Sequence, residues 1–379
     1  MADHHVPAAR QAPRIALLLL DFGDGGVEHS LVNLARGLAG AGVQVDLISG
    51  ASRQPDLDHL PAGVRSLALG PGRRRLQGLL AYLDERQPHI LLSSKPDDDR
   101  IAERARRRTS APTRWFLRVP THLSGRLTGR RATPWRRWWK LRAARRLARR
   151  ADGLIAVSGA VADDLAELTN ICRSRIHTPR NPTIDPDLAP PASPPHPWLA
   201  GREPVILAIG GLRRQKDFAT LLRAFALLRT QRPARLIVLG QGRQRARLLE
   251  LARDLRIAER CDLPGRVSDT AAYLAHASLL ASTSLWEGSP NVIIEAMALG
   301  TPVVATDCPG GTRELLGGGR YGRLAPMGDA QALAEAMGQT LAEPPRTQAL
   351  QAGVEGYTID ASARQYLDAF GISPAEAAA

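Results

Sequence analysis

The sequence predicts an α/β protein of two domains, each built around a doubly wound parallel sheet. Apolar runs of strand length alternate with segments of helical periodicity in both halves of the 379-residue chain. Short turns that contain glycine join them, which is typical of βαβ units. A proline-dense stretch near the middle separates the two series, and the length suffices for two full cores.

The first series begins with the apolar run 14–20, which we interpret as a buried strand. Helical periodicity follows from Leu31 to Leu38, and 43–48 is the next predicted strand. Gly25 and Gly26 lie at the turn between the first strand and the helix. Glycines at such a turn let the backbone approach a phosphate closely, although they also occur there for geometric reasons alone.

The proline-dense stretch, residues 183–202, is interpreted as a semi-rigid linker. The first domain accordingly covers 1–182 and the second 203–355, and the remaining segment, 356–379, contains a last helix. The second domain repeats the pattern of buried strand, glycine turn and helix. Ligands of doubly wound sheets bind beyond the carboxyl ends of the strands. The residues expected at that edge, facing the first domain, are Gly211, Lys216, Gly240, Gly265, Glu287 and Glu295.

The segment from Ser284 to Gly311 is the most informative part of the chain. It predicts a loop that carries Glu287, a helix that begins near Pro290, and a buried strand at 302–306. Glu295 is the one carboxylate inside an otherwise apolar helix, and the free N–H groups of the first helical turn favour an anion between the two acids. Taken alone, the two acids are equally consistent with structural roles.

The two acids are spaced as Glu-x7-Glu within a longer pattern. Gly-Ser-Pro-Asn follows Glu287, Glu-Ala-Met-Ala-Leu-Gly-Thr-Pro-Val-Val-Ala-Thr begins at Glu295, and Gly310, Gly311 and Glu314 come next. In this combination the chain resembles the retaining nucleotide-sugar glycosyltransferases of family 4, and the resemblance extends over most of its length.

The resemblance implies the GT-B fold, in which two Rossmann-like domains face a central cleft and the last helix crosses back to the first domain. It also implies a UDP- or GDP-sugar donor in the second domain and an acceptor in the first. Transfer would proceed with retention of configuration and without a metal or other cofactor. The chain shows no candidate pair of nucleophile and base; in the family, the leaving phosphate helps to deprotonate the acceptor.

A cation beside the donor diphosphate would favour the transition state, because negative charge grows there as the glycosidic bond breaks. Lys216 is the first candidate, with Arg213 and Arg214 beside it. Relatives often carry arginine at the position of Gly211, and we expect the neighbouring arginines to replace it.

Carboxylates suit hydroxyl groups, since each oxygen can accept a charge-assisted hydrogen bond. The resemblance assigns the donor ribose to Glu295, the donor sugar to Glu287 and the base to the backbone from Gly265 to Val267. His122 falls where relatives often carry a histidine near the acceptor, although an ordinary surface histidine is equally consistent. The other residues assigned to the donor are Gly25, Gly26, Gly240, Ser289, Pro290, Asn291 and Val292.

The segment 133–150 holds eight cationic residues and three of the chain's six tryptophans. Its spacing predicts a helix with tryptophan and leucine on one face and guanidinium groups on the other, as in helices that lie in a membrane interface. Two alternatives are tryptophans packed on the domain core and cations bound to nucleic acid. The residues assigned to the membrane or the acceptor are Trp135, Arg136, Arg137, Trp138, Trp139, Lys140 and Arg142.

The formal charge of +14 lies entirely in the first half of the chain, where 31 Lys+Arg face 17 Asp+Glu. Such asymmetry predicts a polyanionic partner for the first domain. Asp97, Asp98 and Asp99 match an Asp-x-Asp metal motif, but we expect a solvated helix cap instead. No apolar run approaches the ~20 residues of a membrane span, and three separated cysteines predict reduced thiols.

We therefore expect a glycosyltransferase that acts on a glycan or glycolipid acceptor in the synthesis of lipopolysaccharide or another cell-surface polysaccharide. It would be cytoplasmic, peripheral on the inner face of an anionic membrane, and would have no nucleic-acid partner. The alternatives are a sugar-nucleotide epimerase of the same architecture, a nucleic-acid-binding protein that uses the basic helix, and a catalytically idle relative, in view of Gly211.

Overall fold

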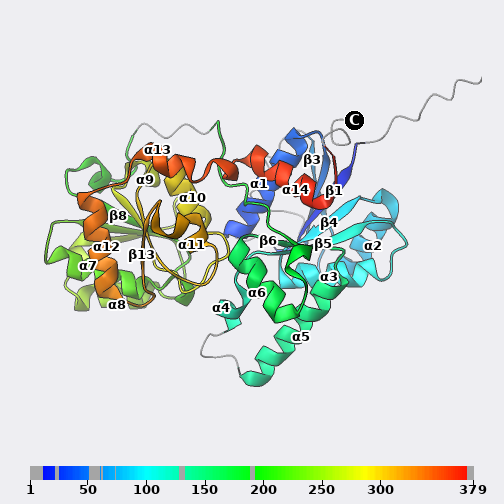
Figure 1. The fold of residues 1–379 in the computed structure, drawn as a ribbon, viewed down its shortest axis with the longest axis horizontal. Coiled ribbons are helices and arrows are strands. Elements are labelled where there is room, and N and C mark those ends of the chain that lie inside the picture. Colours follow the sequence, from blue (N-terminus) through cyan, green and yellow to red (C-terminus); the bar gives the residue numbers. More distant parts are fainter. Residues whose placement is uncertain are drawn as a thin grey trace, which may run out of the picture.

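Two α/β domains, each with its own parallel sheet, make up the protein (Figure 1). The computed structural model describes residues 12–21, 25–50, 60, 63–72, 74–127, 133–187 and 193–373. The predicted pair of doubly wound sheets is confirmed, with seven strands in the first and six in the second. Part of the predicted linker, residues 188–192, lies outside the described residues.

The first sheet has the strand order β3-β2-β1-β4-β5-β6-β7, so the order reverses between β1 and β4. At such a switch point the loops beyond the strand ends diverge and leave room for a ligand. The strands are β1 (Arg14–Leu19), β2 (Gln44–Ser49), β3 (Val64–Ala68), β4 (Ile90–Ser93), β5 (Arg114–Val119), β6 (Gly153–Ala156) and β7 (Ile176–His177). The helices are α1 (Gly26–Gly40), α2 (Arg74–Arg86), α3 (Pro96–Arg106), α4 (Leu123–Leu127), α5 (Pro134–Arg150) and α6 (Gly159–Thr169).

The second sheet has the order β10-β9-β8-β11-β12-β13, with its switch point between β8 and β11. Its strands are β8 (Val205–Ile209), β9 (Arg235–Leu239), β10 (Cys261–Gly265), β11 (Leu279–Ser282), β12 (Val303–Thr306) and β13 (Arg323–Ala325). The helices that follow the linker are α7 (Phe218–Arg229), α8 (Arg245–Asp254), α9 (Thr270–His276), α10 (Asn291–Ala298), α11 (Thr312–Leu315), α12 (Ala330–Ala342), α13 (Thr347–Ala352) and α14 (Ile359–Phe370).

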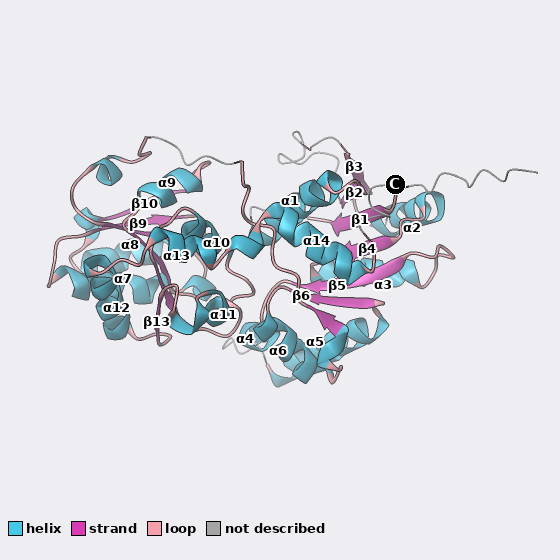
Figure 2. Ribbon diagram, turned by 45° about the horizontal axis from the view of Figure 1, so that its top comes forward, coloured by secondary structure: helices cyan, strands magenta, loops and turns pink. Residues whose placement is uncertain are grey.

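The last helix, α14, packs on α1 of the first domain, far from the elements that precede it in the chain (Figure 2). Tyr366, Leu367 and Phe370 are buried in the same apolar cluster as β1 and α1. The two helices touch at Gly37, where an added Cβ would lie 2.8 Å from the Cβ of Ala363. The chain therefore passes between the domains twice, once through the linker and once before α14.

The acidic cluster before Ile101 departs from the prediction. Helix α3 already begins at Pro96, so the three aspartates form its first turn rather than a cap. Asp98 and Asp99 are buried, not solvated. Asp98 accepts the N–H of Leu20 at 3.0 Å and Asp99 the hydroxyl of Ser93 at 2.7 Å, at the ends of β1 and β4. Burial raises the pKa of Asp98 to about 7 and that of Asp99 to about 8.

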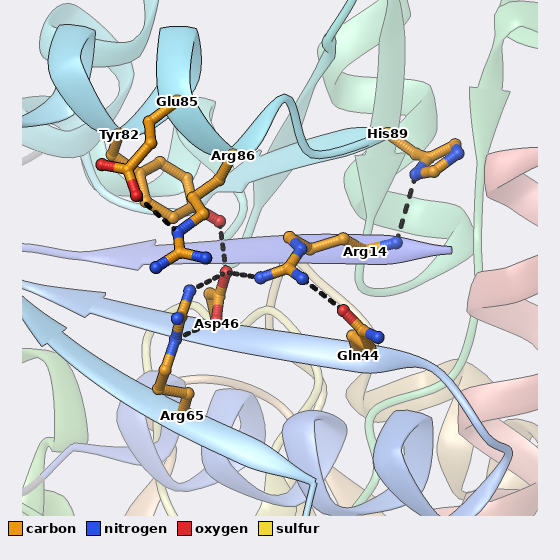
Figure 3. Close-up of polar contacts among 8 residues, drawn as sticks. All are labelled: Arg14, Gln44, Asp46, Arg65, Tyr82, Glu85, Arg86 and His89. Carbon is orange, nitrogen blue, oxygen red and sulfur yellow. Dashed lines mark hydrogen bonds and ion pairs between the residues drawn. The ribbon is translucent and has the colours of Figure 1, made fainter. Parts of the chain in front are cut away.

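Another buried carboxylate, Asp46, ties β2 to its neighbours near the amino ends of the strands (Figure 3). It is 2% exposed and accepts hydrogen bonds from Arg65 at 2.9 Å, from Arg14 at 3.3 Å and from the hydroxyl of Tyr82 at 2.7 Å. Burial and the bond to Asp46 raise the pKa of Tyr82. This cluster lies at the edge of the sheet opposite to the switch-point loops, which indicates a structural role.

Replacing Asp46 should therefore cost stability. Asp46→Ala leaves the Tyr82 hydroxyl and two guanidinium groups without their acceptor, and we expect the free energy of unfolding to fall by about 3 kcal/mol. Urea denaturation measures this change. The control is Glu85→Ala, which removes the exposed carboxylate beside Arg86 (Figure 3) and should change stability by less than about 0.5 kcal/mol. Equal midpoints for the two variants would contradict the structural role of Asp46.

Candidate active site

Three glycine turns of the second domain form a stacked platform at the carboxyl ends of β8, β9 and β10. The N–H of Gly210 donates to the carbonyl of Leu239 at 2.9 Å, and the N–H of Gly240 donates to that of Gly265 at 2.7 Å. Gly240 and Gly265 have φ values of +139° and +97°, which favour glycine. An added Cβ on Gly240 would overlap the Gly210 carbonyl. The backbones of these turns are therefore closely packed against one another at the carboxyl ends of the three strands.

Lys216 lies next to this platform, at the end of a short turn after β8 (Arg214–Lys216). Its ammonium group lies 2.5 Å from a carboxylate oxygen of Glu287, and its carbonyl accepts the hydroxyl of Thr283 at 2.7 Å. Its side-chain stem runs against Gly210, which leaves room for it. The structure thus joins two residues that are far apart in the chain and that the sequence singled out separately.

Glu287 is held from several sides in the loop before α10. It is 8% exposed, its carboxylate accepts the hydroxyl of Ser284 at 2.5 Å, and its N–H donates to the carbonyl of Pro309 at 3.0 Å. Sequence reasoning missed Ser284, although a hydroxyl three residues before a loop acid is a detectable signal. One carboxylate oxygen therefore carries both the Lys216 and the Ser284 contacts.

Arg213 covers the position that lacks a side chain at Gly211. Its guanidinium Nε would lie 3.3 Å from a Cβ added to Gly211, so its stem folds back over this glycine. Arg213 and Arg214 are both exposed, and neither forms an ion pair with any residue that the structure describes. Arg213, two positions after Gly211, can thus supply the cation expected at this place.

Helix α10 follows the loop of Glu287 and carries Glu295. Burial raises the pKa of Glu295 to about 7, and within the described ranges its carboxyl group has no hydrogen-bond or ion-pair partner. It remains partly exposed. Pro290 precedes the helix and is buried, Ser289 is partly exposed, and Val292 packs on the apolar core of the second domain, as Val267 does after β10.

The first domain contacts the loop that carries Glu287 through hydrogen bonds. The N–H of His122 donates to the carbonyl of Glu287 at 3.0 Å, and the hydroxyl of Ser158 donates to that of Gly288 at 3.1 Å. An added Cβ on Gly288 would overlap the carbonyl oxygen of Pro120, so only glycine allows this approach. His122 itself accepts the N–H of Gly125 at 3.2 Å through Nδ1.

A cleft of about 620 Å³ opens beside this contact. His122, the first turn of α6 and the segment 307–314 line it. Glu314 closes one side of it, because its carboxylate accepts the N–H of Gly159 at 2.8 Å, across the two domains. The acids and glycines of this segment therefore make contacts between the domains as well as lining the cleft.

Gly25 and Gly26 lie at the start of α1, where the first domain contacts the second. Gly25 precedes α1, and the carboxylate of Glu28 folds back beside it while also pairing with Lys95 at 2.6 Å. The carbonyl of Gly26 accepts a hydrogen bond from the side chain of Asn291 at 3.1 Å. Asn291 is thus engaged by the first domain in this structure.

The basic tryptophan helix, α5, is not part of this crevice. It extends from the first domain beside α6 and α3 (Figure 1). Trp135, Trp138 and Trp139 are 65%, 48% and 49% exposed and contact one another, which contradicts the alternative in which they pack on the domain core. The helix is held by its other end, where Leu147 and Ala148 are buried.

The cations of α5 share its exposed surface with the tryptophans. Arg137, Lys140 and Arg142 are exposed, and the guanidinium of Arg142 lies 5.5 Å from the centre of the Trp138 ring. Aromatic and cationic side chains are therefore not separated onto two faces at this point, in contrast to the predicted pattern. The side chain of Arg136 lies outside the described residues.

Among the residues that the structure places, no group of three or more His, Cys, Asp or Glu is arranged to hold a metal ion. The same residues include no helix that is long and apolar enough to cross a membrane. All three cysteines are free, with Cys172 exposed and Cys261 and Cys308 buried.

Comparison with known proteins identifies the two halves separately. Residues 25–182 match the family described as glycosyl transferase 4-like domain, and residues 203–343 match that described as glycosyl transferases group 1. Together these matches cover most of the chain and both sides of the crevice.

Two curated relatives match parts of the chain. An N-acetylgalactosaminyltransferase of Campylobacter jejuni that acts on a diphospho-undecaprenol-linked sugar is 36% identical over 126 residues, 33% of this chain and 34% of that protein. The lipopolysaccharide core biosynthesis glycosyltransferase LpsE of Rhizobium meliloti is 35% identical over 140 residues, 37% of this chain and 40% of that protein. The matches thus span well under half of these relatives.

Solved structures match over almost the whole length. Anabaena HepE, crystallised with UDP-glucose, superimposes with a TM-score of 0.76 at 20% identity and covers 94% of this chain and 98% of its own. At 20% identity the match shows that the two proteins share a fold. With both halves matched to glycosyltransferase families and both sheets arranged as in such structures, the chain belongs to the family 4-type glycosyltransferases and has the GT-B fold.

Proposed function

We propose that the protein transfers a sugar from a UDP- or GDP-sugar to a glycan or glycolipid acceptor with retention of configuration. The observation that carries this proposal is the pair of Lys216 and Glu287, 2.5 Å apart in the second domain, where His122 of the first domain contacts the Glu287 backbone. A cation and a carboxylate at this place match the two groups that a sugar diphosphate presents, its phosphates and its hydroxyls.

The donor would bind across the glycine platform of the second domain. Its diphosphate would draw the ammonium group of Lys216 away from Glu287, and the guanidinium of Arg213 would approach from Gly211. Glu287 would then be free to accept hydrogen bonds from the donor sugar, and Glu295 would accept them from the ribose. The UDP-glucose bound to the related HepE structure supports a nucleotide-sugar donor.

The chemical step needs negative charge to be stabilised as the bond between the sugar C1 and the phosphate oxygen breaks. Lys216 and Arg213 would hold that charge in place, so they would favour the transition state over the bound donor. The acceptor oxygen would bond to C1 on the same face, and its proton would pass to the departing phosphate. No cofactor is required for this sequence.

The acceptor would enter from the first domain, near His122 and the cleft of about 620 Å³. The relatives named for lipopolysaccharide core synthesis and for a diphospho-undecaprenol-linked sugar support a cell-surface glycan or its lipid-linked precursor as the acceptor class. No observation on the described residues favours an epimerase, which would convert the donor without an acceptor.

Helix α5 would hold the enzyme at a cytoplasmic membrane surface where such acceptors reside. Its three tryptophans are exposed together, and the helix carries no acidic residue. Aromatic rings suit the membrane interface, and each basic residue near an anionic leaflet contributes about 1 kcal/mol of attraction. In this proposal α5 would lie at the lipid, and the crevice would stay free for both substrates.

A thermal-shift screen against UDP-, GDP- and ADP-sugars without added metal tests the donor site. We expect one nucleotide class to raise the melting temperature, because a ligand that binds the native state stabilises it. Lys216→Ala and Glu287→Ala should reduce the shift and lower transfer at least about tenfold, or about 1.4 kcal/mol. Glu250→Ala, an exposed carboxylate on α8, serves as the control. No shift with any sugar nucleotide, or parental rates in both site variants, would refute the site.

The role of Arg213 can be tested by moving its charge. Arg213→Ala should lower transfer about tenfold, because it removes a cation from the diphosphate site. Adding Gly211→Arg to this variant should restore much of the rate, since the vacated space lies directly over Gly211. Arg223→Ala, an exposed arginine on α7, controls for loss of charge alone. Unchanged transfer in Arg213→Ala would remove this residue from the mechanism.

The membrane surface is tested by replacing Trp135, Trp138 and Trp139 together with serine. Because the three rings are exposed, the melting temperature should stay within a few degrees, while co-sedimentation with phosphatidylglycerol vesicles should fall severalfold. Neutral phosphatidylcholine vesicles and a DNA duplex are the comparison ligands. Equal sedimentation of variant and parent would contradict the lipid contact, and binding to the duplex but not to vesicles would favour the nucleic-acid alternative.

A further inference from the structure

Arg118 is an unusual residue in this fold because it is a buried cation without a counter-charge. It lies on β5, is 1% exposed, and forms no ion pair with any described residue. Its Nη1 atom has no hydrogen-bond partner in the described part of the chain. A buried guanidinium without an acid is costly, and an apolar side chain of the same volume would pack there at lower cost. Its presence calls for a role other than filling the core.

The guanidinium group contacts three segments that are far apart in the sequence. Its Nε donates to the hydroxyl of Tyr366 on α14 at 2.8 Å. Its Nη2 donates to the hydroxyl of Ser30 on α1 at 3.1 Å and to the side-chain oxygen of Asn181 at 2.8 Å. The group is planar and its donors have fixed directions, so it fixes the positions of these three segments relative to one another.

Two of these three segments, the one at Asn181 and α14, lie where the chain passes between the two domains. Asn181 and Pro182 stand where the chain leaves the first domain, and α14 is the helix that returns to it. Asn33 of α1 donates to the carbonyl of Pro182 at 3.1 Å and secures the same point. Arg118 therefore lies at the place where a change in the domain arrangement must be accommodated.

From Asn181 the chain of hydrogen bonds continues into the second domain. The side-chain NH₂ of Asn181 donates to the side-chain oxygen of Asn291 at 2.9 Å, and the NH₂ of Asn291 donates to the carbonyl of Gly26 at 3.1 Å. The path runs from β5 through the linker to the first turn of α10, and returns to the first turn of α1. Both of these turns carry residues that the family resemblance assigns to the donor, Gly26 and Asn291.

We propose that Arg118 is a positioning residue that sets the observed arrangement of the two domains through Asn181 and Asn291. It touches neither substrate. It holds α10, which carries Glu295, against the loop at Gly26, so that the groups of the two domains meet across the crevice. The effect on catalysis rests on the proposed function, whereas the effect on domain arrangement does not.

Small-angle X-ray scattering of the full chain without any sugar nucleotide tests the arrangement itself. Arg118→Met removes the donors at similar volume and should increase the radius of gyration, as the second domain is released from Gly26. Arg114→Met is the matched control: Arg114 is on the same strand and donates to the carbonyl of Phe370 on α14, but it has no contact with Asn181. This control should leave the scattering curve unchanged.

A second variant covers the case in which Arg118→Met does not fold. Asn291→Ala cuts the same path at its far, partly exposed end and leaves the buried cation in place. It should open the domains as well, and the two changes together should open them no further than the larger single change, since both break one path.

Kinetics separate positioning from a general loss of structure. In Arg118→Met the kcat for transfer should fall about tenfold while UDP binding stays within about twofold, because the groups proposed to bind the ribose and the base, Glu295 and the backbone from Gly265 to Val267, belong to the second domain. Parental scattering in both Arg118→Met and Asn291→Ala would overturn the proposal. Opened domains with no transfer in the parent enzyme would uphold it and refute the proposed function instead.

Discussion

The contact of Lys216 with Glu287 is the interaction on which the rest of the crevice depends. It places a cation at the end of β8 next to a carboxylate from the loop after β11, and these strands are neighbours at the switch point of the second sheet. Because Glu287 is only 8% exposed, its charge must be balanced, and Lys216 and Ser284 do so without consuming its second oxygen. The charge of Glu287 is therefore balanced by Lys216, the cation for which the proposed donor diphosphate would compete.

The position of that pair is in turn set by close approach between the domains. Gly288 leaves no space for a side chain beside the Pro120 carbonyl, and the backbone of Glu287 binds that of His122. On the opposite side, Asn291 reaches Gly26. The first domain thus contacts the loop of Glu287 and the first residue of α10. A small shift between the domains would therefore move the groups proposed to surround the substrates.

Much of the fold could be predicted from the chain because its strands are buried on both faces and its turns contain glycine. The runs that became β1, β8 and β12 are continuous and apolar, and helix α10 begins directly after Pro290. β3 gave no such signal, since Val64–Ala68 is half-exposed at the sheet edge. The aspartates of α3 were misjudged because their burial depends on the ends of β1 and β4, which no local pattern reveals.

By itself, the sequence determined the two parallel sheets, the family signature around Glu287 and Glu295, and the concentration of positive charge in the first half. These follow from local periodicity, motif spacing and composition. Only the tertiary structure decided that Lys216 meets Glu287, that Arg213 covers Gly211, that the tryptophans of α5 face outwards, and that Arg118 joins three distant segments. Such contacts link residues tens to hundreds of positions apart or depend on packing, so only the folded chain brings them together.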